Sequence, residues 1–600
     1  MIINFLFFYL FVFLIFIYGS FFNKIYCRFI GIKDLSNNLF IGIFFGLLCL
    51  SLISFLFNFF INLNSIFFKF FLILLIFISI INANIKIYKT FFQNTLLILL
   101  ISPLLNFMPE GYDAALYHFP HQTWIREEKI IFGLTNIHDR FGLISLYNYL
   151  GANLWFNNTF GALPYLQGTY YLLFFSFLFF IMNLKIKSSL WIVLSTILTL
   201  PIWFRYIEPS YGLVDAPYGF LFYIVIILGL ILLIDPKINR PLINLFLIST
   251  CFAFTLKPSG ILVLPYTFLI LVILLKRNFL LFNKIFLKIF LFCFFIISTW
   301  ILKNIINTGC IIYPVQFLCF DLSWSDLNQV FKINEAIKDF SYQYYKYINF
   351  IYLKNFLLSF WHLLLLLILS LTVVFLIFFK FKITKFKNIK FIISIFLIFF
   401  TIYLYSNGSL KGFAYLSQLN AEYNTITIFK EFFILFSIFL CSILLTSIFL
   451  NKETAFLRIN NFIFFIPLFY LFFCFIVWII NAPSPRFAYG YFASLAPTII
   501  LASVKNNFLY DIKRNNLIRN YIYFIVFTLF FLEPIYKNRN NLDFNIRWIP
   551  QIDTIKREGF GVKVENFCWT EKNCYFYNYD LEFNYLLFNY KVFINSKNLK

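Results

Sequence analysis

Most of the residues that could do chemistry lie in one polar stretch between residues 108 and 153. The stretch reads MPEGYDAALYHFPHQTWIREEKIIFGLTNIHDRFGLISLYNYLGAN, in a chain of which only 12% of the residues are charged. It holds three of the four histidines, together with several carboxylates and cations. Polar residues gathered in one loop of an otherwise apolar chain indicate a functional site.

The spacing of Asp113, His118 and His121 predicts a short helix with both imidazoles on one face, because residues three apart are neighbours on a helix. Glu110 lies three residues before Asp113, on roughly the same side. A carboxylate near a histidine can act as a general base or hold a divalent cation. Asp113 and Glu110 are therefore the candidate catalytic residues, and Asp113 with His118 is the candidate metal site. The alternative is an interfacial amphipathic helix whose polar face only meets water.

Ionisable residues at the ends of later apolar segments could complete the same site. Asp215 lies in RYIEPSYGLVDAPYGF, Lys257 opens KPSG, and Arg486 lies in APSPRFAYGYF. Ionisable side chains at membrane depth usually face a cavity or a partner, and cations there can hold a lipid phosphate. For each cation, a local salt bridge or snorkelling is the alternative. The candidate substrate-binding residues are His118, His121, Arg126, Asp215, Lys257 and Arg486.

The elements that carry these residues are transmembrane helices. The chain is 62% hydrophobic, its mean hydropathy is +0.85, and it repeatedly contains apolar runs long enough to span a bilayer. This composition predicts an all-α polytopic membrane protein with about 13–16 transmembrane helices, the first of them retained rather than cleaved as a signal peptide. The candidate spans are roughly 2–18, 38–61, 66–84, 91–106, 166–183, 189–205, 214–234, 241–256, 260–275, 281–302, 357–379, 391–405, 427–450, 461–480, 488–504 and 521–534.

The positions of the cations predict the orientation of the chain. Alternate loops, beginning after the first span, hold half of the 48 basic residues but only four of the 25 acidic residues. An excess of Lys and Arg in short loops marks the cytoplasmic side, so the acidic and aromatic loops are expected on the outer face. The pI near 9.4 is then a sign of topology, and nucleic acid is not the implied partner.

The polar loops divide the chain into four parts. These are N-terminal helices (1–106), a first large outer loop with amphipathic helices and the candidate active site (107–165), a helical bundle with an outer loop at 303–356 (166–534), and a small extracytoplasmic tail (535–600). Two pairs of cysteines fall on the expected outer side, where an oxidising compartment favours disulfides, although reduced thiols remain an alternative. The disulfide candidates are Cys310, Cys319, Cys568 and Cys574.

Several short motifs, in order along residues 100–500, resemble those of GT-C-type bacterial membrane glycosyltransferases. The segment GYDAALYHFPHQTWIREEKIIFGL resembles the first outer loop of that superfamily, in which an acid precedes a Tyr-His-Pro-like stretch. WILKNIINTGCIIYP resembles its "RN…TGNP-(F/V)-YP" segment, and PRFAYGYF its "R-RY-x2-P" segment. VDAPYGF and KPSG are further matches. The chain departs from the pattern at Lys303, where relatives often have Arg, and in having a single Arg in the late motif.

The resemblance implies a transferase that takes a sugar from a polyprenyl-phosphate donor on the outer face of the bacterial inner membrane. The acceptor would be an envelope glycolipid or polysaccharide, with membrane lipid around the site. The first-loop acid would be the general base or a metal ligand, which assigns that role to Asp113 with Glu110 as a second acid. Lys257 and Arg486 would neutralise the leaving lipid phosphate. A divalent cation is the one cofactor implied.

Two other classes of function fit a polar site on a membrane protein. A transporter or flippase of a lipid-linked saccharide would favour inverted repeats and polar sites at the membrane midplane, whereas this chain has no evident repeat and gathers its polar residues at one face. A non-catalytic envelope scaffold would tolerate changes at Asp113, His118 and Lys257.

Overall fold

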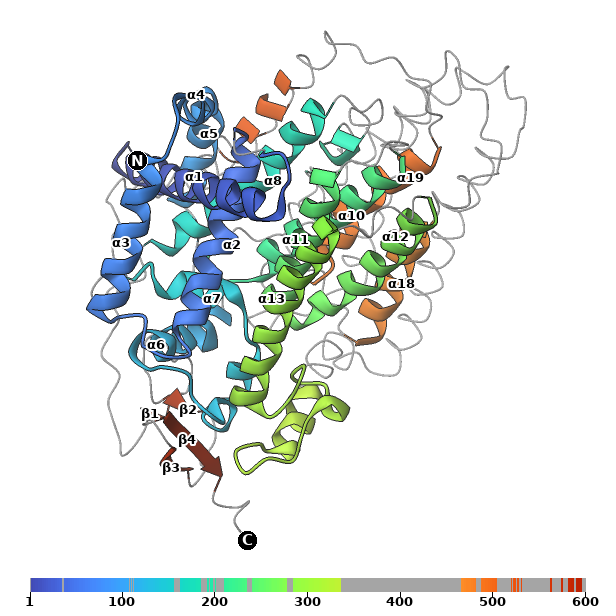
Figure 1. The fold of residues 1–600 in the computed structure, drawn as a ribbon. Coiled ribbons are helices and arrows are strands. Elements are labelled where there is room, and N and C mark those ends of the chain that lie inside the picture. The colour runs from blue at the N-terminus through green and yellow to red at the C-terminus, as the bar shows by residue number, and fades with distance from the viewer. Residues whose placement is uncertain are drawn as a thin grey trace, which may run out of the picture.

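Long apolar helices make up most of the structure, as the apolar runs predict (Figure 1). The computed structural model describes residues 2–34, 37–106, 113–155, 162–184, 210–234, 240–277, 284–335, 466–481 and 487–503, with residues 108 and 111, short stretches within 192–200 and 519–530, and tail residues 562–563, 574–575, 581–586 and 590–595.

The helices and strands of these described residues are, in chain order, α1 (Ile2–Ile30), α2 (Leu39–Phe57), α3 (Ile66–Ile81), α4 (Ile85–Gln93), α5 (Thr95–Leu105), η1 (Ala114–His118), α6 (Phe119–Glu127), η2 (Leu134–Asn136), η3 (Asp139–Gly142), α7 (Leu146–Ala152), α8 (Leu163–Asn183), α10 (Asp215–Ile234), α11 (Arg240–Leu256), η4 (Pro258–Leu262), α12 (Val263–Arg277), α13 (Lys284–Thr308), η6 (Gln316–Leu318), α18 (Ile466–Asn481), α19 (Tyr489–Ser503), β1 (Val562–Lys563), β2 (Cys574–Tyr575), β3 (Leu581–Leu586) and β4 (Tyr590–Asn595).

Six of the described helical segments are long and apolar enough to cross a membrane, or seven if the bent pair α3 and α4 forms one broken span. The six are Asn4–Ile30, Leu39–Phe57, Leu163–Asn183, Asp215–Ile234, Pro258–Lys276 and Lys284–Thr308. The predicted spans 357–379, 391–405 and 427–450 lie outside the described residues. The protein is a helical polytopic membrane protein.

The outer helices of the bundle expose large apolar side chains. α10 lies at the centre and is buried along almost its whole length. By contrast, α3 exposes Phe67 and Phe70 at 67% and 65%, and α13 exposes Phe294 at 60%. Large exposed apolar side chains on peripheral helices are what a lipid-facing surface requires, since lipid rather than water surrounds them.

The first two helices cross at their glycines. A Cβ atom on Gly19 would lie 1.8 Å from the carbonyl oxygen of Gly42, and one on Gly46 would lie 2.2 Å from that of Ile15. Small residues allow the backbones of membrane helices to approach this closely. The crossing fixes α2, whose last turn helps to carry the candidate site.

Three helices run between two chemically different ends of the bundle. The ends of α2, α11 and α13 at Phe57, Leu256 and Thr308 lie beside the first loop (107–165), and we call this the site end. Their other ends, at Leu39, Arg240 and Lys284, we call the basic end. The 25 residues of α13 separate the two ends by about 38 Å, which matches the thickness of a bilayer.

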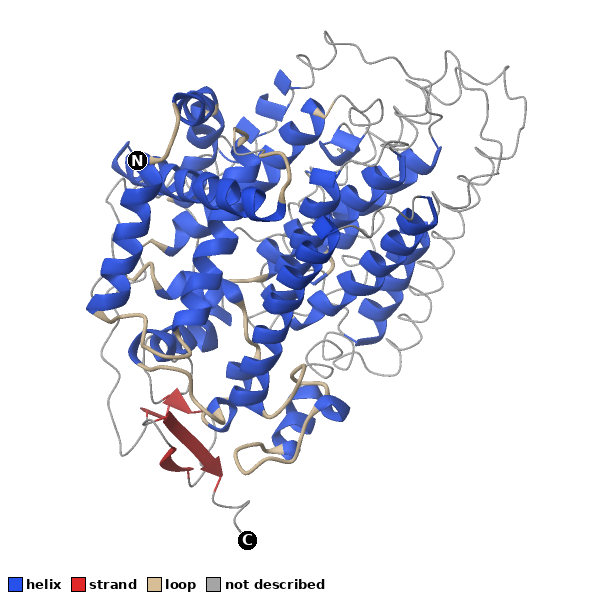
Figure 2. Cartoon of the chain, in the orientation of Figure 1, coloured by secondary structure: helices blue, strands red, loops and turns tan. Residues whose placement is uncertain are grey.

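The tail adds a few short strands to an otherwise helical chain, which agrees with the predicted all-α class. β3 and β4 form an antiparallel hairpin, and β1 pairs with β2 in parallel (Figure 2). The hairpin docks on the first loop, where the Phe132 amide donates to the Lys591 carbonyl at 3.0 Å. Lys591 also pairs with Glu128 at 2.7 Å, and Lys129 lies 4.0 Å over the Tyr590 ring. The tail therefore braces the first loop.

Candidate active site

The first loop folds into short helices that pack against the site end of the bundle. Asp113 stands immediately before η1, a wide helical turn in which the Phe119 amide donates to the Ala114 carbonyl, and the turn continues directly into α6. In Figure 1, α6 and α7 lie at the lower end of α2, near the strands of the tail. The predicted short helix is thus present, although residues 119–126 are buried. The amphipathic alternative, in which the polar side chains meet water, is wrong.

A second segment brings Asp215 beside this loop. The Gly111 amide donates to the Tyr211 carbonyl at 3.0 Å, and the rings of Phe119 and Tyr211 stack. Gly212 has a φ of +82°, and a Cβ atom there would lie 2.5 Å from that of Ala114. Only glycine suits both the backbone angle and the close approach. Three residues later the chain enters α10 at Asp215.

Two carboxylate–cation pairs lie at the heart of the site. In the first loop, Asp113 lies 3.5 Å from Arg140. In the second pair, Lys257, the extended residue just before η4, donates to Asp215 at the start of α10. Asp113 is 6% exposed. The charges of Asp113, Asp215 and Lys257 all act on His118, so the fold brings residues about 140 positions apart into one cluster.

Two buried imidazoles extend the cluster inward. Burial lowers the pKa of His118 to about 4, against opposing contributions from Asp113 and Asp215, and burial also lowers the pKa of His121 to about 3. Both rings are therefore neutral near pH 7. The Asn148 amide nitrogen lies 3.4 Å from His121 Nδ1, and Asn148 also interacts with His118. His118 Nδ1 and His121 Nε2 have no hydrogen-bond partner among the described residues.

The segment His138-Asp139-Arg140 supplies the cation that faces Asp113. Burial alone would raise the pKa of Asp139, but the hydrogen bond and charge of His138, with the charge and amide of Arg140, lower it overall. The Arg140 guanidinium lies 5.3 Å from the Tyr117 ring, and the Phe141 ring stacks on both His138 and His121. These contacts hold Arg140 over the start of η1.

Lys303 forms the floor behind the histidines. The side chain is fully buried, and its ammonium donates to Asn58 Oδ1 at 2.9 Å and to the Phe55 carbonyl at 3.3 Å. The ring of Tyr149 lies 4.1 Å from Nζ, with Phe55 and Phe59 also within 5 Å, which is the geometry of a cation–π cage. Its charge acts on His121, so Lys303 belongs electrostatically to the site.

A disulfide-bonded loop supports the same segment from the other side. Cys310 and Cys319 are joined in a disulfide just beyond α13. Tyr313 lies inside this loop and packs so closely on Gly142 that a Cβ atom at Gly142 would lie 2.6 Å from the Tyr313 ring. Beyond the loop, Gln329 donates to the Thr135 carbonyl at 3.0 Å. The loop that the disulfide closes thus packs against the segment that carries Arg140.

The predicted residues fall into three groups. Asp113, His118, His121, Asp215 and Lys257 come together in the cluster. Arg126 does not: its guanidinium lies 4.9 Å over the Trp155 ring, and burial lowers its pKa. Glu110, Arg486, Cys568 and the side chain of Cys574 lie outside the described residues.

Sequence reasoning did not assign Arg140, Asn148 or Lys303 to the site. Arg140 lies in the same polar stretch as Asp113, so that stretch carried a signal for it. Asn148 also lies in that stretch, and Lys303 stands where the resembling motif often has Arg, but only the packing shows that both act on the histidines.

The described side chains offer an incomplete set of metal ligands. Within the part of the chain that the structure describes, no group of three or more His, Cys, Asp and Glu side chains could hold a metal ion. Asp113 and His118 provide two ligands for the divalent cation that the sequence resemblance implies, fewer than a dedicated site supplies.

The fold and this cluster define a class, a polytopic helical membrane protein with a buried charged site at one end of its bundle. The chain belongs to the family described as a domain of unknown function (DUF8201), which it matches over residues 1–410. That span includes the first loop, Asp215, Lys257 and Lys303. No curated protein and no solved structure matches the chain.

Proposed function

We propose that the protein is a GT-C-like membrane glycosyltransferase that moves a sugar from a polyprenyl-phosphate-linked donor to an envelope glycolipid or polysaccharide. The observation that carries the proposal is the meeting of Asp113, His118, Asp215 and Lys257 at one end of a transmembrane bundle. A lipid-linked donor requires a site beside the bilayer, and transfer requires a base near a cation.

The proposed reaction uses these groups as follows. Asp113 accepts the proton of the acceptor hydroxyl while the oxygen of that hydroxyl attacks the anomeric carbon of the donor. The bond between that carbon and the phosphate oxygen breaks, and the electron pair stays on the phosphate. Lys257 compensates the charge that develops there. Arg486, adjacent in sequence to the Phe487 ring that lies 3.9 Å from Lys257, is proposed as a second cation, and Glu110 as a second acid.

The two carboxylate–cation pairs of the site suit these proposed roles. Arg140 compensates Asp113 and Asp215 compensates Lys257, so the charges within each of these two pairs cancel. An anionic donor phosphate would compete with Asp215 for Lys257. His118 is neutral and experiences the charges of Asp113, Asp215 and Lys257, and its imidazole can donate or accept a hydrogen bond to a sugar hydroxyl.

Two observations support placing the site on the extracytoplasmic face of a bacterial inner membrane. The Cys310–Cys319 disulfide lies at the site end, and disulfides persist in oxidising compartments. The opposite end carries the basic residues, as the positive-inside rule expects of the cytoplasmic side.

The test compares envelope glycolipids and polysaccharides by mass spectrometry in a strain lacking the gene. The strain is complemented with wild type, Asp113→Asn or Asp321→Asn, all at equal membrane levels. Asp321 is a matched control, since it is an exposed acid in the loop beyond α13 that makes no ion pair among the described residues. We expect a sugar-sized mass difference to return with wild type and Asp321→Asn and to stay missing with Asp113→Asn, a loss of at least about 100-fold. Full restoration by Asp113→Asn would overturn the proposal.

A further inference from the structure

The basic end of the bundle carries cations from three helices that have little acidic compensation. Lys33 follows α1, Arg240 begins α11, and Lys288 lies in the first turns of α13. Arg28, Lys33 and Arg240 are exposed, and none of them makes an ion pair within the described residues. These cations remain available to an anion from outside the chain.

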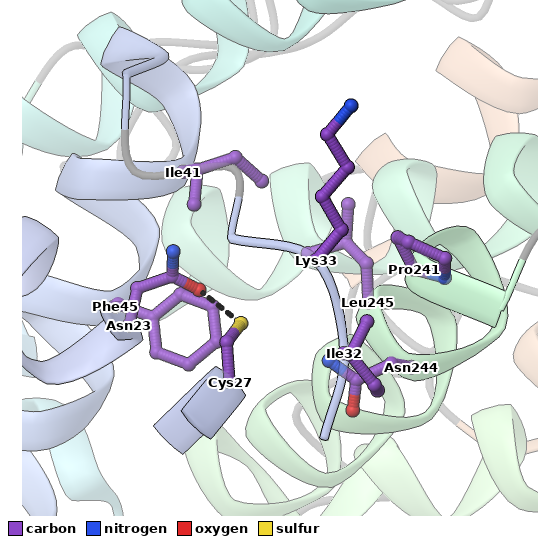
Figure 3. Close-up of a pocket in the computed structure, with 9 residues that line it drawn as sticks. All are labelled: Asn23, Cys27, Ile32, Lys33, Ile41, Phe45, Pro241, Asn244 and Leu245. Atoms are coloured by element: carbon purple, nitrogen blue, oxygen red, sulfur yellow. Dashed lines mark hydrogen bonds between the residues drawn. The ribbon is translucent and has the colours of Figure 1, made fainter. Parts of the chain in front are cut away.

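A narrow hollow opens beside Lys33, one of these cations (Figure 3). Ile41 and Phe45 of α2 and Leu245 of α11 form an apolar part of its lining. Lys33 lies at the mouth, and its amino group points away from the floor (Figure 3). The side chains of Ile41, Phe45 and Leu245 are only 1%, 3% and 2% exposed, so the hollow is too narrow to admit a headgroup.

The polar atoms on the floor of the hollow are already engaged. Asn23 donates to Asp34 Oδ1 at 2.7 Å and accepts from the Cys27 thiol at 3.4 Å. Asn244 Oδ1 accepts from the Tyr26 hydroxyl at 2.6 Å. The polar groups of the floor thus have hydrogen-bond partners within the protein, whereas Lys33 at the mouth makes no ion pair among the described residues.

Lipid-facing side chains stand directly beside these cations. Phe29 is 64% exposed and is next in sequence to Arg28, while Leu287 is 57% exposed and precedes Lys288. Lys288 itself donates to the Phe29 carbonyl at 2.8 Å, which ties α13 to the end of α1. Cations interleaved with exposed apolar side chains mark the level at which lipid headgroups meet acyl chains.

We propose that the exposed cations around the mouth of this hollow bind the phosphate headgroup of an anionic phospholipid from the leaflet at the basic end. Lys33 holds the phosphate by charge-assisted hydrogen bonds, and Arg240, adjacent to the lining residue Pro241, adds a second charge within a Debye length. The glycerol and the first acyl carbons lie against the exposed side chains of Phe29 and Leu287. A soluble phosphate would gain the charges but not this apolar contact. Basic sites between helices at the cytoplasmic side commonly take such headgroups.

The test measures the thermal stability of the purified full-length protein in a neutral detergent as lipid is added. The probes are phosphatidylglycerol, phosphatidylcholine and inorganic phosphate. We expect phosphatidylglycerol alone to raise the melting temperature, and the concentration for half of that rise to increase at least tenfold in Lys33→Gln/Arg240→Gln. Both residues are exposed, so the variant should fold, which its unchanged melting temperature without lipid would show.

Lys69→Gln is the matched control. Lys69 is an exposed lysine near the site-end start of α3, and its amine donates to Asn64. We expect its response to phosphatidylglycerol to equal that of wild type. An equal response to phosphatidylcholine, an undiminished response of the double variant, or a full response to inorganic phosphate would each overturn the proposal. Because no activity is measured, the result does not depend on the proposed glycosyl transfer.

Discussion

The two ends of the bundle handle charge in opposite ways. At the site end, Asp113, Asp215, Lys257 and Lys303 are largely withdrawn from water and each has a partner. At the basic end, Arg28, Lys33 and Arg240 are exposed and make no ion pair among the described residues. A buried charge without a partner is destabilising, so the pairing at the site end is obligatory, whereas exposed cations need none.

The difference separates two uses of ionisable residues in one membrane protein. In the proposed orientation, charges at the basic end would direct topology and meet lipid headgroups, for which an approximate position suffices. Charges at the site end have defined partners and distances, which catalysis requires. Substitutions at the site end should therefore change stability far more than the same substitutions at the basic end.

Asn58→Ala should have the largest effect on stability. Asn58 is the residue directly after α2. Its side chain donates to the carbonyls of Ile125 and Glu128 and accepts from the buried Lys303 ammonium. We expect a loss of about 3 kcal/mol in the free energy of unfolding, because several buried polar groups lose their partner together. The measurement is denaturant unfolding in detergent micelles.

Asn82→Ala is the control for that experiment at the basic end. Asn82 also ends a helix, but it is exposed and makes one local hydrogen bond, to the Ile78 carbonyl. A loss below about 0.5 kcal/mol is expected there. Equal losses in the two variants would contradict the contrast between the ends.

Acid should loosen the site end selectively. The pKa values of His118 and His121 in the folded protein, about 4 and about 3, lie below the 6.5 of a free imidazole, so the unfolded state binds protons first as the pH falls. The contribution of the two neutral histidines to the free energy of unfolding is fully present above pH 6.5. It is lost as the pH falls from 6.5 towards 4, by about 1.4 kcal/mol per pH unit for each histidine.

Hydrogen exchange of residues 113–152 between pH 7 and pH 5, corrected for the intrinsic rate, would measure this loosening. The basic end has no histidine among its described residues and should keep its protection. A His118→Gln/His121→Gln variant should lose the pH dependence. If that variant kept the wild-type dependence, the histidines would not be its source.

Lys257→Met should have an intermediate effect. It leaves Asp215, whose side chain is 12% exposed, without its cation, at a cost of about 2 kcal/mol. Adding Asp215→Asn should recover most of that loss, with a coupling of about 1–2 kcal/mol in a thermal unfolding cycle. Arg240→Met at the basic end should change stability by less than about 0.5 kcal/mol in neutral detergent. Strict additivity of the two site-end changes would show that the pair is not coupled.

Lys591→Gln should have the smallest effect at the site end. The ion pair with Glu128 joins side chains that are 26% and 20% exposed, so its contribution to stability is only about 0.5 kcal/mol. The sensitive readout is the rate at which a protease releases the tail, which should rise in the variant. Lys33→Gln should leave this rate unchanged, and a rise there as well would argue against a specific brace.

The apolar helices were predictable because each follows from a continuous run of side chains. The expected span 214–234 corresponds to α10 at Asp215–Ile234, and 38–61 to α2 at Leu39–Phe57. The first helix runs further than expected, to Ile30, because the residues after position 18 remain largely apolar despite Lys24 and Arg28. The tail was less predictable, since its short strands depend on pairing and on contact with the first loop.

The candidate site was predictable where its residues share a local segment. Asp113, His118 and His121 lie within nine residues of one another, so helix geometry alone relates them. Arg126 lies on the same segment and was assigned with them, yet it packs on Trp155. The direction in which that side chain faces depends on a neighbour from another part of the chain.

By itself the sequence determined that this is a helical membrane protein, where its polar loop lies, and which end of the bundle is basic. Those properties depend on composition and on periodicity within a segment, which need no knowledge of distant residues. Only the tertiary structure decided that Asp113 faces Arg140, that Lys257 meets Asp215, and that Lys303 lies caged beneath His121. Each of these joins residues from separate segments, and only the packing of the helices brings such residues within a few ångströms.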